Sequence, residues 1–316
     1  MDFLLLSGSA NGANHIEAAT NGHDALSVRH TNDSIVAVVA DGCSSQPHSE
    51  VGAKIVAPMV TNYVAQVLRK GLSLSDPRVR RNIRDRILSR IMVLADEMAG
   101  DDPTAPVLNA HFQFTILGVA MTPTDTFFFR IGGDGMYGVN NETHVVYPEK
   151  GNRPAYLVYA LTGSPMTDAD PTLTDFQILH TLPTSDVKTF WIGTDGTGEM
   201  LAAVNKTVNR EPVVSVEGLL ETDRYYDKPA LLSRRLQQLV AADVIGDDIT
   251  LVAGKRLTAL SDPAPAVAEE ETGAEPVASV ETEVADEGKA GAVIMAAEAG
   301  PGSATKTDPK PESRNK

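Results

Sequence analysis

The chain has 316 residues, of which 42% are hydrophobic, so it is long enough to bury one large core or two smaller ones. Its formal net charge of −15 argues against a nucleic acid as a partner. Cys43 is the only cysteine, which excludes an intrachain disulfide and suits a reducing cytoplasm.

The N-terminal residues predict two strands joined by a polar loop. The strand candidates run from Phe3 to Ser7 and from Ala25 to Arg29, and the loop between them ends in His23 and Asp24. The first apolar run is too short for a signal peptide or a membrane span, so we expect no membrane association. A histidine in such a loop is more often solvated than a ligand or an acid catalyst, and both interpretations stay open for His23.

A third predicted strand, residues 35 to 40, is apolar on both faces and stops at Asp41-Gly42. This pattern is typical of a strand that is buried on both sides. An Asp-Gly pair alone is only a common turn signal. Here it recurs, because two later apolar runs stop at Asp134-Gly135 and at Asp195-Gly196. Three predicted strands therefore each end in an aspartate.

Two long helices are predicted after the third strand. The first runs from Lys54 to Arg69 with Ser49 as a candidate cap, and Pro58 should kink it or mark its real start. The second begins with the cap Asp76 and is rich in arginine. These arginines indicate either a solvated face or a docking surface for an acidic or phosphorylated partner. The residues expected on its buried face are Val79, Ile83, Ile87, Leu88, Ile91, Leu94 and Met98.

The remaining elements complete the predicted fold. Residues 112–147 have the pattern of a meander, followed by strand signals at 156–161, 176–179 and 189–193 and by helices from Gly198 and over 229–241. Antiparallel strands interleaved with helix pairs predict an α+β protein, a four-layer α/β/β/α sandwich. Two packed, mostly antiparallel sheets would be flanked by helix pairs.

The last predicted strand reverses the order of acid and apolar run. In "VIGDDITLVAG", Asp247 and Asp248 precede the apolar residues 249–253. The start of one strand and the end of its antiparallel neighbour lie at the same edge of a sheet, so Asp41, Asp195 and Asp247 are expected to converge there. Carboxylates brought together repel one another unless a cation compensates them. Hard divalent ions with oxygen ligands are the natural compensation.

Taken in this order, these segments resemble the type 2C protein phosphatases, a family of metal-dependent Ser/Thr phosphatases, and in particular its bacterial members. The resemblance covers residues 8–255 and rests on "VADGCSSQPHSEVGA", "GGDG", "GTDGTGEM" and "GDDITLV". It implies the family's four-layer fold and the hydrolysis of phosphoserine and phosphothreonine monoesters on proteins by metal-activated water. The implied cofactors are two Mn²⁺ or Mg²⁺ ions.

The resemblance also implies roles for the acidic residues. Asp41 would bridge the two ions, and Asp195 and Asp247 would complete the coordination of one of them. The carbonyl group of Gly42 would help to hold the other ion.

Further residues match positions around those ions. Asp134 and Glu199 match ligands of a third, weaker ion. Asp24 matches the acid that positions a metal-bound water, and His23 beside it stands where many relatives carry Glu or Gln.

Two departures from the family pattern leave a second function open. Cys43 stands where many relatives carry a histidine as general acid, and a thiol with an ordinary pKa of about 8.5 is a poor substitute. His23, His48 or a metal-bound water would then donate the proton. The loop before the second strand lacks the family's phosphate-binding arginine, so Arg130 or Arg153 would have to serve. The alternative function is a catalytically weak, phosphatase-like binding or regulatory module.

The composition changes abruptly after Leu257. Residues 259–316 contain 12 acidic and 5 basic residues, a net charge of −7 that leaves −8 for the rest of the chain. Such a segment cannot bury enough apolar surface to fold. We therefore expect a phosphatase 2C-like domain over residues 1–257 and a disordered acidic tail over 258–316, in which "AGAVIMAA" is either a partner-binding peptide or a short apolar stretch without a role.

Overall fold

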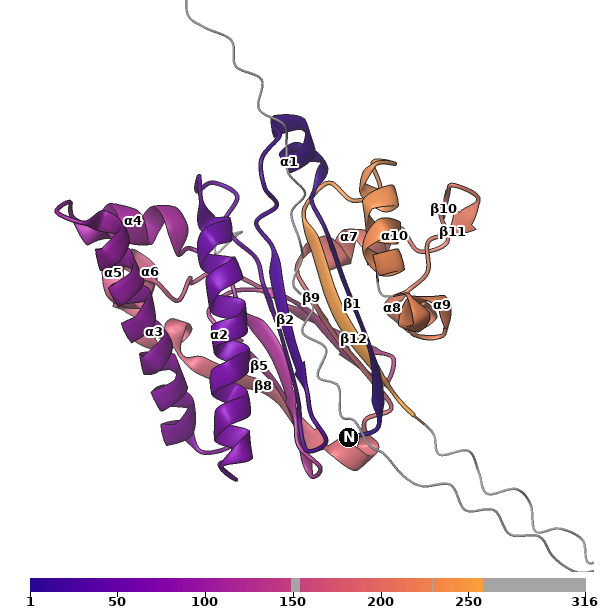
Figure 1. The fold of residues 1–316 in the computed structure, drawn as a ribbon, viewed down its shortest axis with the longest axis horizontal. Coiled ribbons are helices and arrows are strands. Elements are labelled where there is room, and N and C mark those ends of the chain that lie inside the picture. Colours follow the sequence, from indigo (N-terminus) through magenta and orange to yellow (C-terminus); the bar gives the residue numbers. More distant parts are fainter. Residues whose placement is uncertain (149–153, 229, 258–316) are drawn as a thin grey trace, which may run out of the picture. The chain divides into compact units, whose positions relative to one another are not determined.

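The computed structural model of the protein describes residues 1–148, 154–228 and 230–257, all within a compact unit that spans Met1–Asp262. Two five-stranded antiparallel sheets pack face to face in this unit (Figure 1). The first sheet has the order β2 (Ala25–His30), β3 (Ile35–Ala40), β4 (Leu117–Met121), β5 (Asp125–Ile131) and β8 (Phe176–Pro183). The second has the order β1 (Phe3–Ala10), β12 (Ile249–Arg256), β9 (Thr189–Gly193), β6 (Gly135–Val139) and β7 (Glu142–Val146).

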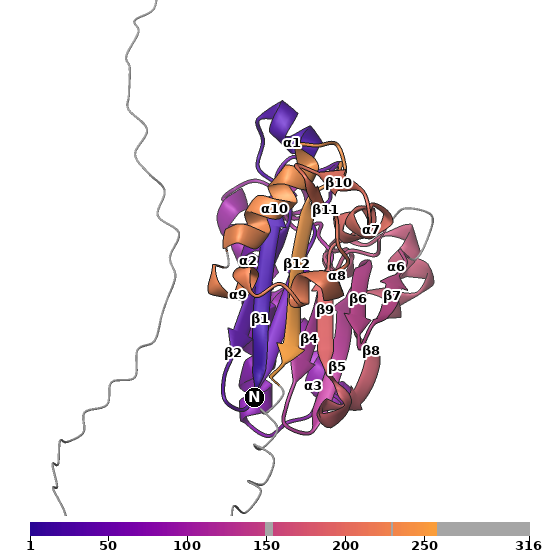
Figure 2. The same cartoon turned by 90° about the vertical axis from the view of Figure 1, so that its right-hand side faces the viewer.

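Helices cover the outer face of each sheet. On the first sheet lie α2 (Ser49–Arg69) and α3 (Pro77–Ala99), and α4 (Thr104–His111) packs against these two helices. On the second lie α7 (Gly196–Ala202), α8 (Val216–Leu220), α9 (Arg224–Asp227) and α10 (Ala230–Val240). Figure 2 shows α10 crossing in front of β1 and β12. The α+β sandwich predicted from the sequence is confirmed. The connections hold the short elements α1 (Ala13–Ala18), α5 (Tyr159–Thr162), α6 (Pro165–Ala169), η1 (Pro171–Thr174), η2 (Thr184–Asp186), β10 (Thr207–Val208) and β11 (Glu211–Pro212).

The strand β3 shows why its sequence is apolar on both faces. Ile35, Ala37 and Val39 pack in the layer between the two sheets, and the residues that alternate with them pack against the helices of the first sheet. All six residues of β3 are buried. Hydrophobic burial on both faces fixes the position of this strand, and with it the position of the aspartate that follows.

The helix α2 differs from the prediction at both of the points that the sequence raised. Ser49, predicted as its cap, is its first residue, so His48 is the cap residue, and the helix continues through Pro58. Buried residues before and after the proline pack on β2 and β3, and this packing outweighs the missing backbone hydrogen bond. Within the described residues, α2 alone is long and apolar enough to cross a membrane by length and composition, and half of that stretch is buried, as in a core helix.

Three strand predictions were wrong in detail. The predicted meander breaks between β5 and β6, because these strands belong to different sheets and the chain crosses between them at Gly132 and Gly133. Both glycines have positive φ angles, 64° and 102°, which most other residues would adopt only with strain. The strand predicted from residue 112 begins at Leu117. Residues 156–161, also predicted as a strand, form a turn and then the first residues of α5.

The second long helix, α3, agrees with the prediction at its start and differs at its end. The Asp76 carboxylate accepts a hydrogen bond from the backbone N–H of Arg78 at 2.8 Å, as expected of a cap. Met98, predicted to be buried, is 44% exposed in the last turn. Arg84 of this helix donates to the carbonyl group of Thr174 at 2.8 Å, so it ties neighbouring segments together rather than lying free on a solvated face.

The unbroken course of α2 predicts that Pro58→Ala stabilises the protein. Alanine restores a backbone donor in the helix interior at an exposed position, which should raise the free energy of unfolding by about 1–2 kcal/mol. Urea unfolding of both proteins measures this difference. A lower stability of the variant would show that the helix needs the proline.

Candidate metal centre

Four aspartates line one pocket of about 530 Å³, which we call the acid pocket. Asp41 follows β3 in the first sheet, whereas Asp195 follows β9 and Asp247 precedes β12 in the second sheet. Asp134 lies on the segment that crosses from one sheet to the other. From the sequence, the first three were predicted to lie at one edge of a single sheet. The structure corrects this, because Asp41 reaches the pocket from the opposite sheet.

Backbone pairing beyond the end of β3 fixes Asp41. The backbone N–H of Thr115 donates to the carbonyl oxygen of Asp41 at 2.7 Å, and the N–H of Cys43 donates to the carbonyl oxygen of Gln113 at 3.0 Å. Gly42 between them allows a close approach, since a Cβ atom there would lie 2.8 Å from the hydroxyl group of Ser49. The aspartate is therefore presented by main chain that is held on both sides.

Asp195 and Asp247 are brought together by the antiparallel pairing of β9 with β12, as the sequence predicted. Gly193, the last residue of β9, pairs with Leu251. The chain then turns into α7 directly against the start of β12, where a Cβ atom on Gly196 would lie 2.2 Å from the carbonyl oxygen of Asp248. A glycine at this position lets the two acidic segments touch.

The aspartates of the acid pocket raise one another's pKa. Burial has the largest effect on Asp41, followed by repulsion from Asp24 and Asp195, and together they raise its pKa well above the ordinary value. Asp195 is exposed to the solvent in the pocket, yet desolvation of its carboxyl group and repulsion from Asp247 and Asp134 raise its pKa to about 7. Burial also raises the pKa of Asp247. At neutral pH these groups need either protons or cations.

The pocket suits hard divalent cations by its chemistry. Its ionisable lining is dominated by carboxylates, the ligands that Mg²⁺ and Mn²⁺ prefer. No three His, Cys, Asp or Glu side chains in the described residues lie close enough to form a coordination sphere by themselves. Ions of this type commonly use one or two carboxylates and complete their shell with water and substrate oxygens. An open pocket with separate carboxylates fits that mode of binding.

Three predicted site residues do not line the acid pocket. Asp24 is buried behind it, where the hydroxyl group of Thr194 donates to its Oδ2 atom at 2.7 Å. Glu199 accepts a hydrogen bond from the backbone N–H of Gly246 at 2.5 Å. His23 is only 7% exposed and is the third of these residues.

The contacts of His23 define its role more closely. The hydroxyl group of Ser49 donates to the carbonyl oxygen of Cys43 at 2.9 Å, so His23 Nδ1, 3.1 Å from the same hydroxyl oxygen, is the donor to it. Its Nε2 atom lies 3.9 Å from Glu50. Burial, and next the neighbouring His15, lower the pKa of His23, so it is neutral at pH 7. His23 therefore packs behind the pocket wall.

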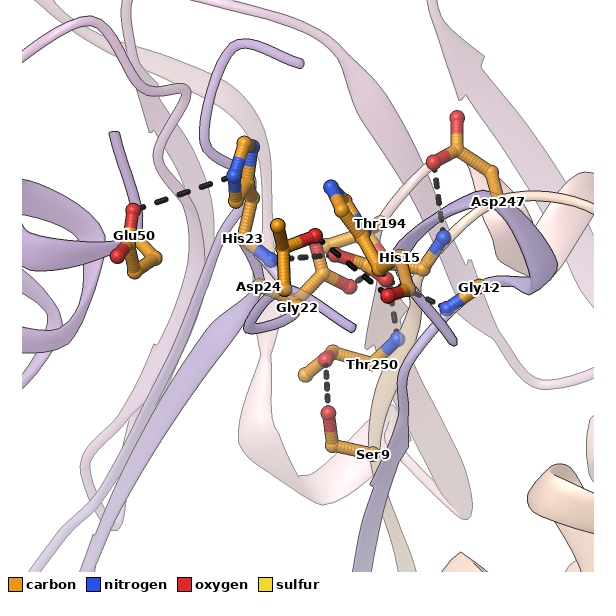
Figure 3. Close-up of polar contacts among 12 residues, drawn as sticks. Ser9, Gly12, His15, Gly22, His23, Asp24, Glu50, Thr194, Asp247 and Thr250 are labelled. Carbon is orange, nitrogen blue, oxygen red and sulfur yellow. Dashed lines mark hydrogen bonds and ion pairs between the residues drawn. The ribbon is translucent and has the colours of Figure 1, made fainter. Parts of the chain in front are cut away.

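Asp248, for which the sequence indicated no role, holds the polar loop in place through Gly12, His15 and His23, the three residues of the loop that Figure 3 labels around it. Its Oδ1 atom accepts from the backbone N–H of Gly12 at 2.6 Å and from His15 Nδ1 at 2.8 Å, and its Oδ2 atom accepts from the backbone N–H of His23. The sequence held a signal for this role. Successive side chains along a strand point to opposite faces, so the two acids of the Asp-Asp pair point in opposite directions and the second one points inward. Tyr156 and Gln113 also line the acid pocket, and no pattern in the sequence indicated it.

Comparison with known proteins places this arrangement in context. The profile of the protein phosphatase 2C family matches residues 11–239. A sex-determining protein of C. elegans has a similar structure, with 13% identity and a TM-score of 0.50 over 81% of this chain and 65% of the other. The phosphatase Stp1 of Staphylococcus aureus shares 12% identity over 82% and 96% of the two chains, with a TM-score of 0.43. A bacterial serine phosphatase shares 12% identity over 80% of this chain and 97% of the other, with a TM-score of 0.43. A comparison with curated proteins found no match.

The raised pKa of Asp195 predicts how pH affects the metal-free protein. Its carboxyl group binds a proton more tightly in the folded state than in the unfolded state, where its pKa is near 3.8. Its contribution to stability is therefore complete below about pH 4 and is lost as the pH rises to about 7. In EDTA, Asp195→Asn should melt at a higher temperature than the wild type at pH 8 and show a weaker decline from pH 5 to 8. If the melting temperatures of the two proteins declined in parallel from pH 5 to 8, the raised pKa of Asp195 would be contradicted.

The two consecutive aspartates predict very different effects on stability. Asp248→Ala leaves three donors without their acceptor and should lower the free energy of unfolding by about 3 kcal/mol or more. Asp247→Ala is the matched control, because it removes a repelling charge together with a single hydrogen bond, from the backbone N–H of Asp248 at 2.8 Å, and should lower the stability of the metal-free protein by at most about 1 kcal/mol. Urea unfolding in EDTA measures both. Equal losses would refute the anchoring role of Asp248.

Proposed function

The chain belongs to the protein phosphatase 2C family, and from this premise we propose that it hydrolyses phosphoserine and phosphothreonine monoesters on proteins with the help of divalent ions. One observation carries the proposal: aspartates from both sheets line a single pocket that opens to solvent. Such a group of repelling acids has a use in metal chemistry and none in a purely structural domain. The single cysteine and the negative charge support a cytoplasmic protein that acts on phosphoproteins and not on nucleic acids.

The residues of the acid pocket divide into candidate ligands for the ions. Asp41, Asp195 and Asp247, with the carbonyl group of Gly42, would hold two Mn²⁺ or Mg²⁺ ions, and Asp134 would hold a third, weaker one. Glu199 could join that third site only by giving up its bond to Gly246. When bound, such ions lower the pKa of water towards about 7 and neutralise phosphoryl charge.

Neutral polar groups of the chain would orient the substrate. Ser44, Gln46 and Gln113 line the acid pocket, and no lysine or arginine does so among the described residues. Amide and hydroxyl donors can fix the phosphoryl oxygens in direction while the ions balance their charge. Neither His23 nor His48 lines the pocket, so we assign protonation of the leaving oxygen to water held there.

One observation favours the second candidate, a catalytically weak binding or regulatory module. The described lining of the acid pocket holds Cys43 and no cationic side chain, so the ions alone would balance the negative charge of the phosphate. Such a protein would bind divalent ions and phosphopeptides, but its hydrolysis of the phosphopeptides would be too slow to measure. Activity measurements separate the two candidates, because only the phosphatase shows metal-dependent turnover of a phosphothreonine peptide.

The proposed chemistry predicts metal-dependent turnover that depends on Asp195. Wild-type protein should hydrolyse p-nitrophenyl phosphate and a phosphothreonine peptide with Mn²⁺ and not with EDTA. Asp195→Ala should reduce kcat/KM at least about 100-fold, because it removes a ligand of the ions that activate water. Asp134→Ala should reduce it less. Asp101→Ala, an exposed acid outside the pocket, is the control.

Two results would contradict the proposal. Full activity of Asp195→Ala at saturating Mn²⁺ would reject the assignment of the ligands. Turnover of neither substrate by wild-type protein that binds Mn²⁺ would favour the regulatory module.

A further inference from the structure

A second pocket of about 410 Å³ adjoins the acid pocket. Ser44, Gln46 and Asp247 line both pockets, so one ridge of side chains separates them. The helix α1 and the loop that follows it form the other wall of the second pocket. We call this second pocket the loop pocket. Its volume lies within the range of about 300–1,000 Å³ that is usual for ligand sites.

The wall of the loop pocket is held in a fixed position, although α1 has no buried residues of its own. His15, which lines the pocket, is tied at 2.8 Å to Asp248 at the start of β12. The backbone N–H of Ala13 donates to the carbonyl oxygen of Gly246 at 3.0 Å. These bonds connect α1 to the second sheet, so the pocket exists before any ligand binds.

The charges around the loop pocket select against acidic ligands. The ions of the acid pocket would compensate Asp247, which lines both pockets, whereas Glu199 stays outside the described lining of the acid pocket and accepts a hydrogen bond from Gly246 of the loop pocket. Each of its two histidines faces a carboxylate of its own, His15 that of Asp248 and His23 that of Glu50. The described lining includes no lysine or arginine. A positive charge that either imidazole carried would thus be compensated already, and the pocket favours cationic groups.

We propose that the loop pocket binds the residues next to the phosphorylated residue of a polypeptide substrate, with a preference for basic over acidic side chains. The proposal rests on the proposed function, because a phosphoryl group bound in the acid pocket would fix the position of the phosphorylated residue and thereby that of its neighbours. An extended chain advances by about 3.3 Å per residue, so the next few residues reach across the ridge of Ser44 and Gln46. The amide groups of Asn14 and Gln46 and the hydroxyl group of Thr20 are suited to main-chain hydrogen bonds.

Filling the loop pocket tests this inference. Ala18 is exposed and lines the pocket, so Ala18→Trp should obstruct it without disturbing the core. Ile16→Trp is the matched control, because Ile16 lies on the same helix, is 57% exposed and does not line the pocket. With Mn²⁺, Ala18→Trp should raise the KM of a phosphothreonine peptide at least about fivefold and leave kcat/KM for p-nitrophenyl phosphate within about twofold. An unchanged peptide KM, or an equal loss on both substrates, would overturn the proposal.

The charge preference is tested with two peptides that differ only beside the phosphothreonine. Arginine neighbours should give a lower KM than glutamate neighbours in the wild type, and Ala18→Trp should reduce this ratio. An equal or inverted ratio in the wild type would refute the preference.

A binding measurement separates this proposal from the proposed function. The Kd of a fluorescent phosphothreonine peptide in Mn²⁺ should rise at least about fivefold in Ala18→Trp and stay constant in Ile16→Trp, whether or not the wild type turns the peptide over. Absence of turnover would refute the phosphatase alone. Equal Kd values in all three proteins would refute the loop pocket as a peptide site.

Discussion

The repulsion among aspartates that two separate sheets bring to the same place is the constraint on which this structure depends. Asp41 comes from the first sheet, Asp195 and Asp247 come from the second, and the chain crosses between the sheets at Asp134. Each sheet is fixed by apolar packing on both of its faces, so the carboxylates cannot move apart without disturbing a core. Folding therefore stabilises an arrangement that is electrostatically unfavourable, and a bound cation would remove that cost.

Backbone groups, and side chains that lie behind the acid pocket, hold the residues of this pocket in place. The Asp248 carboxylate accepts hydrogen bonds from the backbone N–H groups of Gly12 and His23 and from His15 Nδ1. These bonds connect the N-terminal loop to β12. This connection builds one wall of the loop pocket as well as the region behind the candidate ligands. The proposed ion sites and the proposed peptide site would thus share a single anchored segment, and the same hydrogen bonds explain how an exposed six-residue helix keeps a defined place.

The sequence predicted those features that follow from local alternation. The burial of β3 on both faces and the adjacency of Asp195 and Asp247 could be deduced, because periodicity and antiparallel pairing determine them. The sheet to which each strand belongs could not, since a tight pair of glycines looks the same whether the chain forms a hairpin or changes sheets. The course of α2 through Pro58 was equally hidden, because tertiary packing decided it. The predicted tail lies outside the described residues.

The central claim is that these carboxylates form one cation site shared by both sheets. Thermal melting in EDTA and in saturating Mn²⁺ tests it most directly, for the wild type and for Asp41→Asn. An ion at about a hundredfold excess over its Kd adds about 2.7 kcal/mol, so the wild type should melt roughly 5–10 °C higher with Mn²⁺. Asp41→Asn should lose most of this shift while melting no lower than the wild type in EDTA. A wild type without a shift, or a variant with an undiminished one, would contradict the account.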